Sequence, residues 1–128
     1  MTRILVIDDD AALRNTLTIL LGARGFDVVV AENGKSGIDA IKARPFDLVI
    51  VDLFMPGMDG LETTKALRQH NPSIPIIAVS GFMFGGRCPE MPNFDAMATE
   101  AGAISTLYKP FRPAELLQAI QKAIGVTA

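Results

Sequence analysis

Acidic side chains directly follow two of the apolar runs in this chain. Asp8 and Asp9 come after the run Ile4–Ile7, and Asp52 closes the run Leu48–Val51. An uninterrupted run of β-branched and aliphatic residues is typical of a strand that is buried on both faces. The sequence therefore places carboxylates where buried strands are expected to end.

Two other polar side chains end later apolar runs. Ser80 closes the run that begins at Pro75, and Lys109 follows the run Ile104–Tyr108. The carboxyl ends of parallel strands lie on one edge of a sheet, and open α/β sheets bind their ligands at that edge. We therefore expect three carboxylates, one hydroxyl and one ammonium group to converge on a single crevice.

This set of groups indicates phosphoryl transfer. Two carboxylates about 4 Å apart repel by roughly 4 kcal/mol at an effective dielectric constant of 20, so such a cluster takes up protons or holds a cation. Oxygen ligands without Cys or His favour Mg²⁺ over zinc. With an ammonium and a hydroxyl group opposite, the site could hold phosphoryl oxygens and form an aspartyl phosphate. Taken singly, each residue has a structural interpretation as a helix cap or turn residue. Because all of these residues end strands of the same predicted sheet, we favour a functional site over separate structural roles.

The elements that must position these residues alternate as strand and helix five times. This order predicts an α/β fold, a parallel sheet with helices on both faces and right-handed crossovers. The segment Phe82–Pro92 carries Gly and Pro clusters without a period and is predicted to be a loop. The predicted strands are Ile4–Ile7, Val28–Val30, Leu48–Val51, Pro75–Ser80 and Ile104–Tyr108. The first predicted helix carries Leu13, Leu17, Leu20 and Leu21 on one face and is stopped by Gly22 and Gly25, and the other predicted helices are Ser36–Ala43, Leu61–Gln69, Phe94–Ala101 and Pro113–Ile124.

Composition indicates one compact domain over residues 1–128. The chain has a net charge of −2 and a hydrophobic fraction of 49%, which suffices for a single core. No basic stripe indicates a nucleic-acid surface, and no apolar run approaches the ~20 residues that span a bilayer. Cys88 is the single cysteine and no secretory leader is evident, so the expected location is the reducing cytoplasm. The sequence does not indicate an oligomeric state.

The motifs resemble the receiver domain of bacterial response regulators, the phosphoacceptor proteins of two-component signalling. The matching pieces are Ile4–Asp10, Asp47–Gly60, Ile76–Gly81 and Lys109–Phe111, which together span nearly the whole chain. The resemblance implies a flavodoxin-like, doubly wound five-stranded sheet of strand order 2-1-3-4-5. It also implies a sensor histidine kinase or a histidine phosphotransfer protein as partner, and Mg²⁺ as cofactor.

The resemblance assigns a role to each strand-end residue. Asp52 matches the phosphoacceptor, Lys109 the family's lysine and Ser80 the switch hydroxyl. Asp8 and Asp9 match the acidic pair, with Asp9 as a direct Mg²⁺ ligand. The implied metal site comprises Asp8, Asp9, Asp52 and the backbone carbonyl of Phe54.

The sequence departs from the family pattern at the switch. The family's aromatic switch position, three residues before the lysine, holds Thr106, and the aromatic residue is Tyr108 instead. The segment that follows Ser80 is also longer than is usual in the family. We expect Phe82 or Phe84 to fill the space beside Thr106 in one of two states, in place of a swinging ring; an uncoupled insertion is the alternative.

The first helix carries a predicted docking surface. Its inward stripe is Leu13, Leu17, Leu20 and Leu21, and at 100° per residue Ile19 lies on roughly the opposite side. Similar receivers dock a kinase's helical bundle with the first helix and the loop after the fifth strand. The expected contact residues are Ala12, Asn15, Ile19 and Pro110.

Two other functions stay open. Asp8-x-Asp10 resembles the start of the haloacid dehalogenase motif, but Ala12 stands where that motif has Thr or Val. The chain could thus be a small phosphohydrolase with an Asp nucleophile. A receiver-shaped scaffold that is never phosphorylated is the other alternative. Only Val126–Ala128 follows the last predicted helix, so we expect output by protein contact or onward phosphotransfer, and no enzymatic turnover of a separate substrate.

Overall fold

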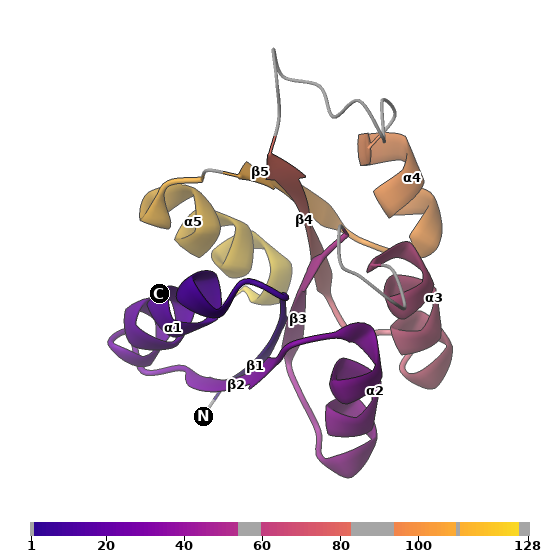
Figure 1. The fold of residues 1–128 in the computed structure, drawn as a ribbon, viewed down its shortest axis with the longest axis horizontal. Coiled ribbons are helices and arrows are strands. Elements are labelled where there is room, and N and C mark those ends of the chain that lie inside the picture. Colours follow the sequence, from indigo (N-terminus) through magenta and orange to yellow (C-terminus); the bar gives the residue numbers. More distant parts are fainter. Residues whose placement is uncertain (1, 54–59, 83–93, 110, 126–128) are drawn as a thin grey trace.

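The structure is a computed structural model, which describes residues 2–53, 60–82, 94–109 and 111–125. For residues 80–82, 94 and 95 it describes the backbone alone. Five strands and five helices alternate along the described chain (Figure 1). The elements are β1 Arg3–Ile7, α1 Ala11–Gly22, β2 Asp27–Ala31, α2 Gly34–Ala43, β3 Leu48–Asp52, α3 Gly60–His70, β4 Ile76–Phe82, α4 Phe94–Ala101, β5 Ser105–Lys109 and α5 Pro113–Ile124.

The strands form one parallel sheet in the order β2-β1-β3-β4-β5. This is the predicted flavodoxin-like order, so the prediction of fold class is confirmed. The register pairs Ile7 of β1 with Val51 of β3. Asp8 and Asp52 are the next residues on these neighbouring strands, so the register brings their backbones side by side at the carboxyl edge of the sheet.

Helices cover both faces of the sheet. Helices α1 and α5 lie on one face, and α2, α3 and α4 lie on the other (Figure 1). Successive strand residues point to opposite faces, so each central strand contributes to two cores, which explains its continuous apolar sequence. The core under α1 and α5 includes Ile4, Val6, Leu17, Leu21, Leu48, Ile50, Leu116 and Ile120, and the other includes Leu5, Ile7, Ile41, Val49, Val51, Leu67 and Ala98.

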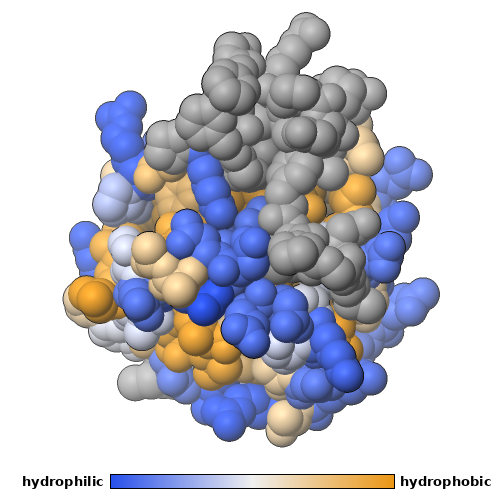
Figure 2. All heavy atoms as spheres, in the orientation of Figure 1, coloured by the Kyte–Doolittle hydropathy of each residue, from blue (hydrophilic) through white to orange (hydrophobic). Residues whose placement is uncertain are grey.

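The outer surface is mainly polar on the face drawn in Figure 2. Most coloured atoms there belong to hydrophilic side chains, with smaller hydrophobic areas between them. Among the helices that the structure describes, none is both long and apolar enough to cross a lipid bilayer.

Strand β4 is longer than predicted. The sequence pattern predicts a strand that ends at Ser80 and a loop that starts at Phe82, but the structure continues β4 through Phe82. The reason is its neighbour: β5 runs to Lys109 and offers pairing partners at Tyr108 and Lys109, with a shift of register between Ser80 and Phe82. The prediction that Phe82 lies in a loop is therefore wrong.

Gly60 brings the start of α3 against the end of β3. Its N–H donates to the carbonyl oxygen of Leu53 at 3.3 Å. A Cβ atom at position 60 would overlap the Cα atom of Leu53 and the carbonyl oxygen of Asp52. Because these are backbone atoms, they cannot turn aside as a flexible side chain would. Only glycine fits here, and the fit sets the position of Asp52 relative to α3.

Gly60→Ala is expected to lower the free energy of unfolding by about 3 kcal/mol, because the added methyl group forces backbone apart. Gly22→Ala is the matched control, since Gly22 ends α1 with open space around it. That change should be neutral or stabilising by up to about 1 kcal/mol. Urea unfolding of both variants measures the difference, and equal effects would contradict the close approach at Gly60.

Candidate functional site

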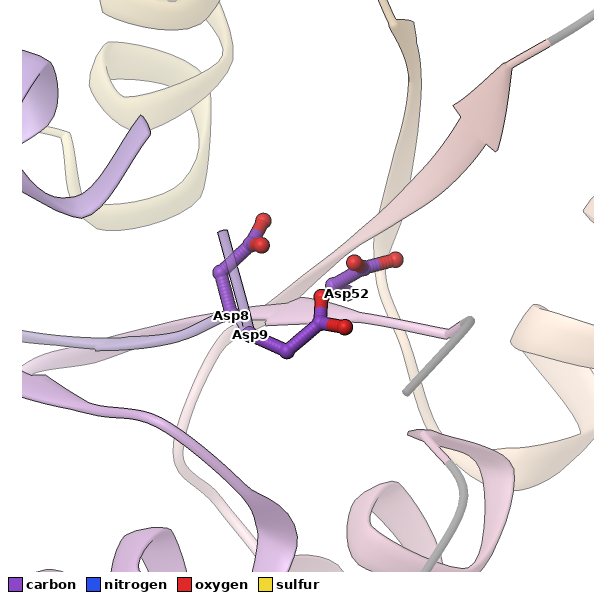
Figure 3. Close-up of side chains that lie close together, drawn as sticks. All are labelled: Asp8, Asp9 and Asp52. Carbon is purple, nitrogen blue, oxygen red and sulfur yellow. The ribbon is translucent and has the colours of Figure 1, made fainter. Parts of the chain in front are cut away.

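Three carboxylates meet at the carboxyl edge of the sheet. Asp8 and Asp9 follow β1, and Asp52 is the last residue of β3. One carboxylate oxygen from each lies within 4.8 Å of the other two. Figure 3 shows the three side chains side by side at the ends of their strands. Asp8 and Asp52 are each only 3% exposed, whereas Asp9 is exposed to solvent. The cluster is thus open on the side of Asp9.

Lys109 neutralises part of this cluster. Its Nζ atom lies 2.8 Å from Oδ2 of Asp8 and 3.3 Å from Oδ2 of Asp52. Because β4 separates β5 from β3, the lysine side chain reaches across β4 to make both contacts. Burial lowers the pKa of Lys109, but the hydrogen bond to Asp8 and the charges of Asp52 and Asp8 outweigh burial, so the pKa is raised. The ammonium group therefore stays charged beside the carboxylates.

The turn after β1 is held by side-chain hydrogen bonds. Oδ1 of Asp8 accepts a hydrogen bond from the N–H of Asp10 at 2.9 Å. Oδ1 of Asp10 accepts from the N–H groups of Ala12 and Leu13 at 3.0 and 3.4 Å and so caps α1. Nη1 of Arg14 donates to the carbonyl oxygen of Asp8 at 2.7 Å. These contacts fix the strand end relative to the first turn of α1.

Arg14 is a site residue that the sequence pattern does not single out. Its side chain returns from α1 to the end of β1, a contact that depends on the angle between helix and strand. One signal could have found it: Arg14 lies one helical turn after the cap residue Asp10, whose carbonyl oxygen accepts the Arg14 N–H at 3.0 Å. A residue there faces back toward the strand end.

The remaining predicted site residues are only partly described. The backbone of Ser80 lies in β4 opposite Tyr108, and the backbone of Phe82 follows in the same strand; the side chains of both are outside the described part. Thr106 lies in β5 opposite Ala78 and is half-buried. Phe54, Phe84 and Pro110 fall outside the described residues.

The exposed and buried residues of the first helix are distributed as the helical pattern predicts. Leu17 and Leu21 are buried, at 2% and 0% exposure, and Ile19 is 74% exposed. Ala12 and Asn15 are exposed on the same helix. The helical pattern therefore predicted correctly which residues of α1 face the core and which face solvent.

The acidic cluster fits a divalent cation. When all three carboxylates are ionised, they carry three negative charges against the one positive charge of Lys109, and repulsion at this spacing costs several kcal/mol without further compensation. The donors are all carboxylate oxygens, which favour Mg²⁺ over zinc. Asp8, Asp9 and Asp52 are thus the residues that would hold the ion.

The ion pairs of Lys109 predict a dependence of stability on pH. Without metal, they should stabilise the fold fully below pH 10.5, the ordinary pKa of lysine, and this contribution should disappear as the pH rises through the higher pKa of the folded state. At pH 8 we expect Lys109→Met to lower the free energy of unfolding by about 2 kcal/mol. This loss is smaller than for a fully buried ion pair, because the site is open to solvent. Urea unfolding of both proteins in the presence of a chelator measures this difference. A difference that stays constant up to strongly alkaline pH would contradict it.

Comparison with curated proteins shows similarity along nearly the whole chain. The chain is 35% identical over 120 residues to the DNA-binding response regulator MtrA of Mycobacterium tuberculosis, a match that covers 93% of this chain and 49% of MtrA. It is 33% identical over 129 aligned positions to the sensor histidine kinase GacS of Pseudomonas protegens, covering 97% of this chain and 13% of GacS. The chain thus spans about half of MtrA and a small part of GacS.

A solved structure and a family model also match nearly the whole chain. The chemotaxis protein CheY4 of Vibrio cholerae superposes with a TM-score of 0.85 at 29% identity, covering 96% of this chain and 98% of CheY4. The family model for the response regulator receiver domain matches residues 4–121. This range includes both acidic strand ends and Lys109. The chain therefore belongs to the response regulator receiver domain family of two-component signalling.

Proposed function

We propose that Asp52 accepts a phosphoryl group from a phosphohistidine of a sensor histidine kinase or histidine phosphotransfer protein, in a reaction that requires Mg²⁺. One observation carries this proposal. The Asp52 carboxylate is buried at the end of β3, 3.3 Å from the Lys109 ammonium group and clustered with the carboxylates of Asp8 and Asp9.

The chemistry follows from the positions of these groups. A carboxylate oxygen of Asp52 forms a bond to phosphorus as the N–P bond of the phosphohistidine breaks, and the imidazole leaves with the electron pair of that bond. The Lys109 ammonium group, already beside Asp52, offsets negative charge on the phosphoryl oxygens. Bound Mg²⁺ would supply further charge neutralisation, held by Asp8, Asp9, Asp52 and the proposed carbonyl ligand of Phe54.

Signal output is proposed to occur by protein contact or by onward phosphotransfer. Ser80, with Thr106, Phe82 and Phe84, is proposed to carry the change at Asp52 to the protein surface. DNA binding in the name of MtrA belongs to that protein, of which this chain spans about half, and we propose no nucleic-acid or membrane contact for the receiver domain itself. With a sensor histidine kinase or a histidine phosphotransfer protein as its proposed partner, the receiver domain is proposed to act in the cytoplasm.

Incubation with acetyl phosphate and Mg²⁺ tests the proposed function against its two alternatives. A receiver gains one acid-stable, base-labile phosphoryl group per chain. A phosphohydrolase with an Asp nucleophile would release phosphate continuously, and a receiver-shaped scaffold would neither gain nor release it. Intact-protein mass and released phosphate, followed in the same sample, distinguish these three results.

Ile19→Asp is expected to slow phosphotransfer from a histidine kinase at least tenfold and to leave labelling by acetyl phosphate unchanged. The reason is that a charge in the centre of an apolar contact costs binding energy, while Ile19 lies on α1 away from the core. Phosphotransfer and acetyl phosphate labelling are measured side by side.

Ile104→Asp is the matched control, because Ile104 is 57% exposed and precedes β5. It should leave both reactions unchanged. Phosphotransfer at the normal rate in a folded Ile19→Asp variant would contradict a docking role for Ala12, Asn15, Ile19 and Pro110. Equal slowing of both reactions would mean instead that the substitution damages the fold.

A further inference from the structure

We propose that Arg14 is a positioning residue for divalent-cation binding, because it holds the peptide group from which the Asp9 side chain projects. The inference rests on the proposed function, in which Asp8, Asp9 and Asp52 bind the cation. Arg14 would orient Asp9, the most exposed of these three carboxylate ligands.

The two acidic residues after β1 are constrained in different ways. The Asp8 carboxylate is held on both oxygens, by Lys109 at 2.8 Å and by the N–H of Asp10 at 2.9 Å. The Asp9 carboxylate is exposed, and no other residue in the described ranges donates a hydrogen bond to it. The direction of the Asp9 side chain is therefore set mainly by its backbone.

Arg14 acts on that backbone. Its Nη1 atom donates to the carbonyl oxygen of Asp8 at 2.7 Å, a short hydrogen bond strengthened by the charge of the guanidinium group. This carbonyl belongs to the planar peptide group that includes the nitrogen atom of Asp9. When the carbonyl is held, rotation of the peptide plane is restricted, and with it the direction in which Asp9 leaves the strand end.

Arg14 is itself fixed by the helix. Its N–H donates to the carbonyl oxygen of Asp10 at 3.0 Å, and its own carbonyl oxygen accepts from the hydroxyl group of Thr18 at 2.8 Å. Since Asp10 caps the same helix, the guanidinium group extends from a rigid first turn. Outer residues of this kind typically change metal affinity by roughly 10–100-fold when they are removed.

Orientation and charge have opposite effects on cation affinity. The positive charge of Arg14 repels a cation, so loss of charge alone would tighten binding. Loss of orientation would weaken binding. Because Arg14 is partly exposed to solvent, water screens its charge, and we expect the effect of orientation to be larger.

Mg²⁺ titration of the full chain by calorimetry tests this inference. Arg14→Met should raise the dissociation constant for Mg²⁺ about tenfold. Arg14→Lys, which keeps the charge and one donor but not the planar guanidinium group, should raise it by less. Arg24→Met is the matched control, since Arg24 is exposed in the turn after α1, and it should leave the constant unchanged.

Thermal unfolding in a chelator shows whether each variant folds without metal, and the midpoints should stay within a few degrees of the original protein. If Arg14→Met does not fold, the same Mg²⁺ titration of Arg14→Lys and Arg14→Gln tests the role of Arg14. If these variants bind Mg²⁺ as tightly as the original protein or more tightly, while Asp9→Ala abolishes binding, the proposed role of Arg14 is contradicted. That result would leave the proposed function standing. Absence of Asp9-dependent Mg²⁺ binding in the unmodified chain would overturn the proposed function and this inference together.

Discussion

Asp52→Asn is expected to reduce labelling by acetyl phosphate to an undetectable level. The amide of asparagine has nearly the shape of the carboxylate but lacks the anionic oxygen that must form the bond to phosphorus. Asp52 ends β3 and is buried beside Lys109, at the position that the family resemblance assigns to the phosphoacceptor. Intact-protein mass after incubation with acetyl phosphate and Mg²⁺ measures the loss.

The matched control for this change is Asp39→Asn, the same substitution at an exposed position on α2. It should be labelled like the original protein. Asparagine at position 52 removes one ion pair of Lys109 but leaves the contact with Asp8, so the variant should remain folded by circular dichroism. Labelling of a folded Asp52→Asn variant at the full rate would show that another residue is the acceptor.

Asp9→Ala is expected to abolish the dependence of labelling on Mg²⁺ and to reduce the labelling rate in saturating Mg²⁺ at least tenfold. Asp9 supplies the exposed carboxylate of the cluster, and its removal leaves Asp8 and Asp52, both already paired with Lys109. The measurement is the initial labelling rate as a function of Mg²⁺ concentration.

Loss of stability should not explain that result. The Asp9 side chain is exposed, and its removal relieves repulsion within the cluster, so the free energy of unfolding in a chelator should be unchanged or slightly higher. Labelling that keeps its normal rate and Mg²⁺ dependence in Asp9→Ala would remove Asp9 from the proposed metal site.

Much of the fold could be predicted because its strands lie between two layers of helices. Residues such as Leu48 to Val51 are buried on both faces, and this produces continuous apolar runs that are readily separated from the helical patterns. The five alternations, the strand order implied by the family resemblance and the meeting of Asp8, Asp9 and Asp52 all agree with the structure. Each of these features depends on local sequence or on the general geometry of parallel sheets.

The features that the sequence does not predict depend on distances and angles between elements. The length of β4 is set by pairing with β5 and its shift of register between Ser80 and Phe82. The contact of Lys109 with Asp8, closer than its contact with Asp52, depends on how far a side chain reaches across a neighbouring strand. The return of Arg14 to the Asp8 carbonyl depends on the angle between α1 and β1. None of these quantities is encoded in a short sequence motif.

The most direct test of the central claim is identification of the residue that carries the phosphoryl group. The protein is incubated with acetyl phosphate and Mg²⁺, the acyl phosphate is reduced with borohydride, and the peptides are sequenced by mass spectrometry. The proposed function predicts homoserine at position 52 and unmodified aspartate at positions 8 and 9. Reduction at another residue, or an unmodified residue 52 in a chain that carries a phosphoryl group, would contradict it.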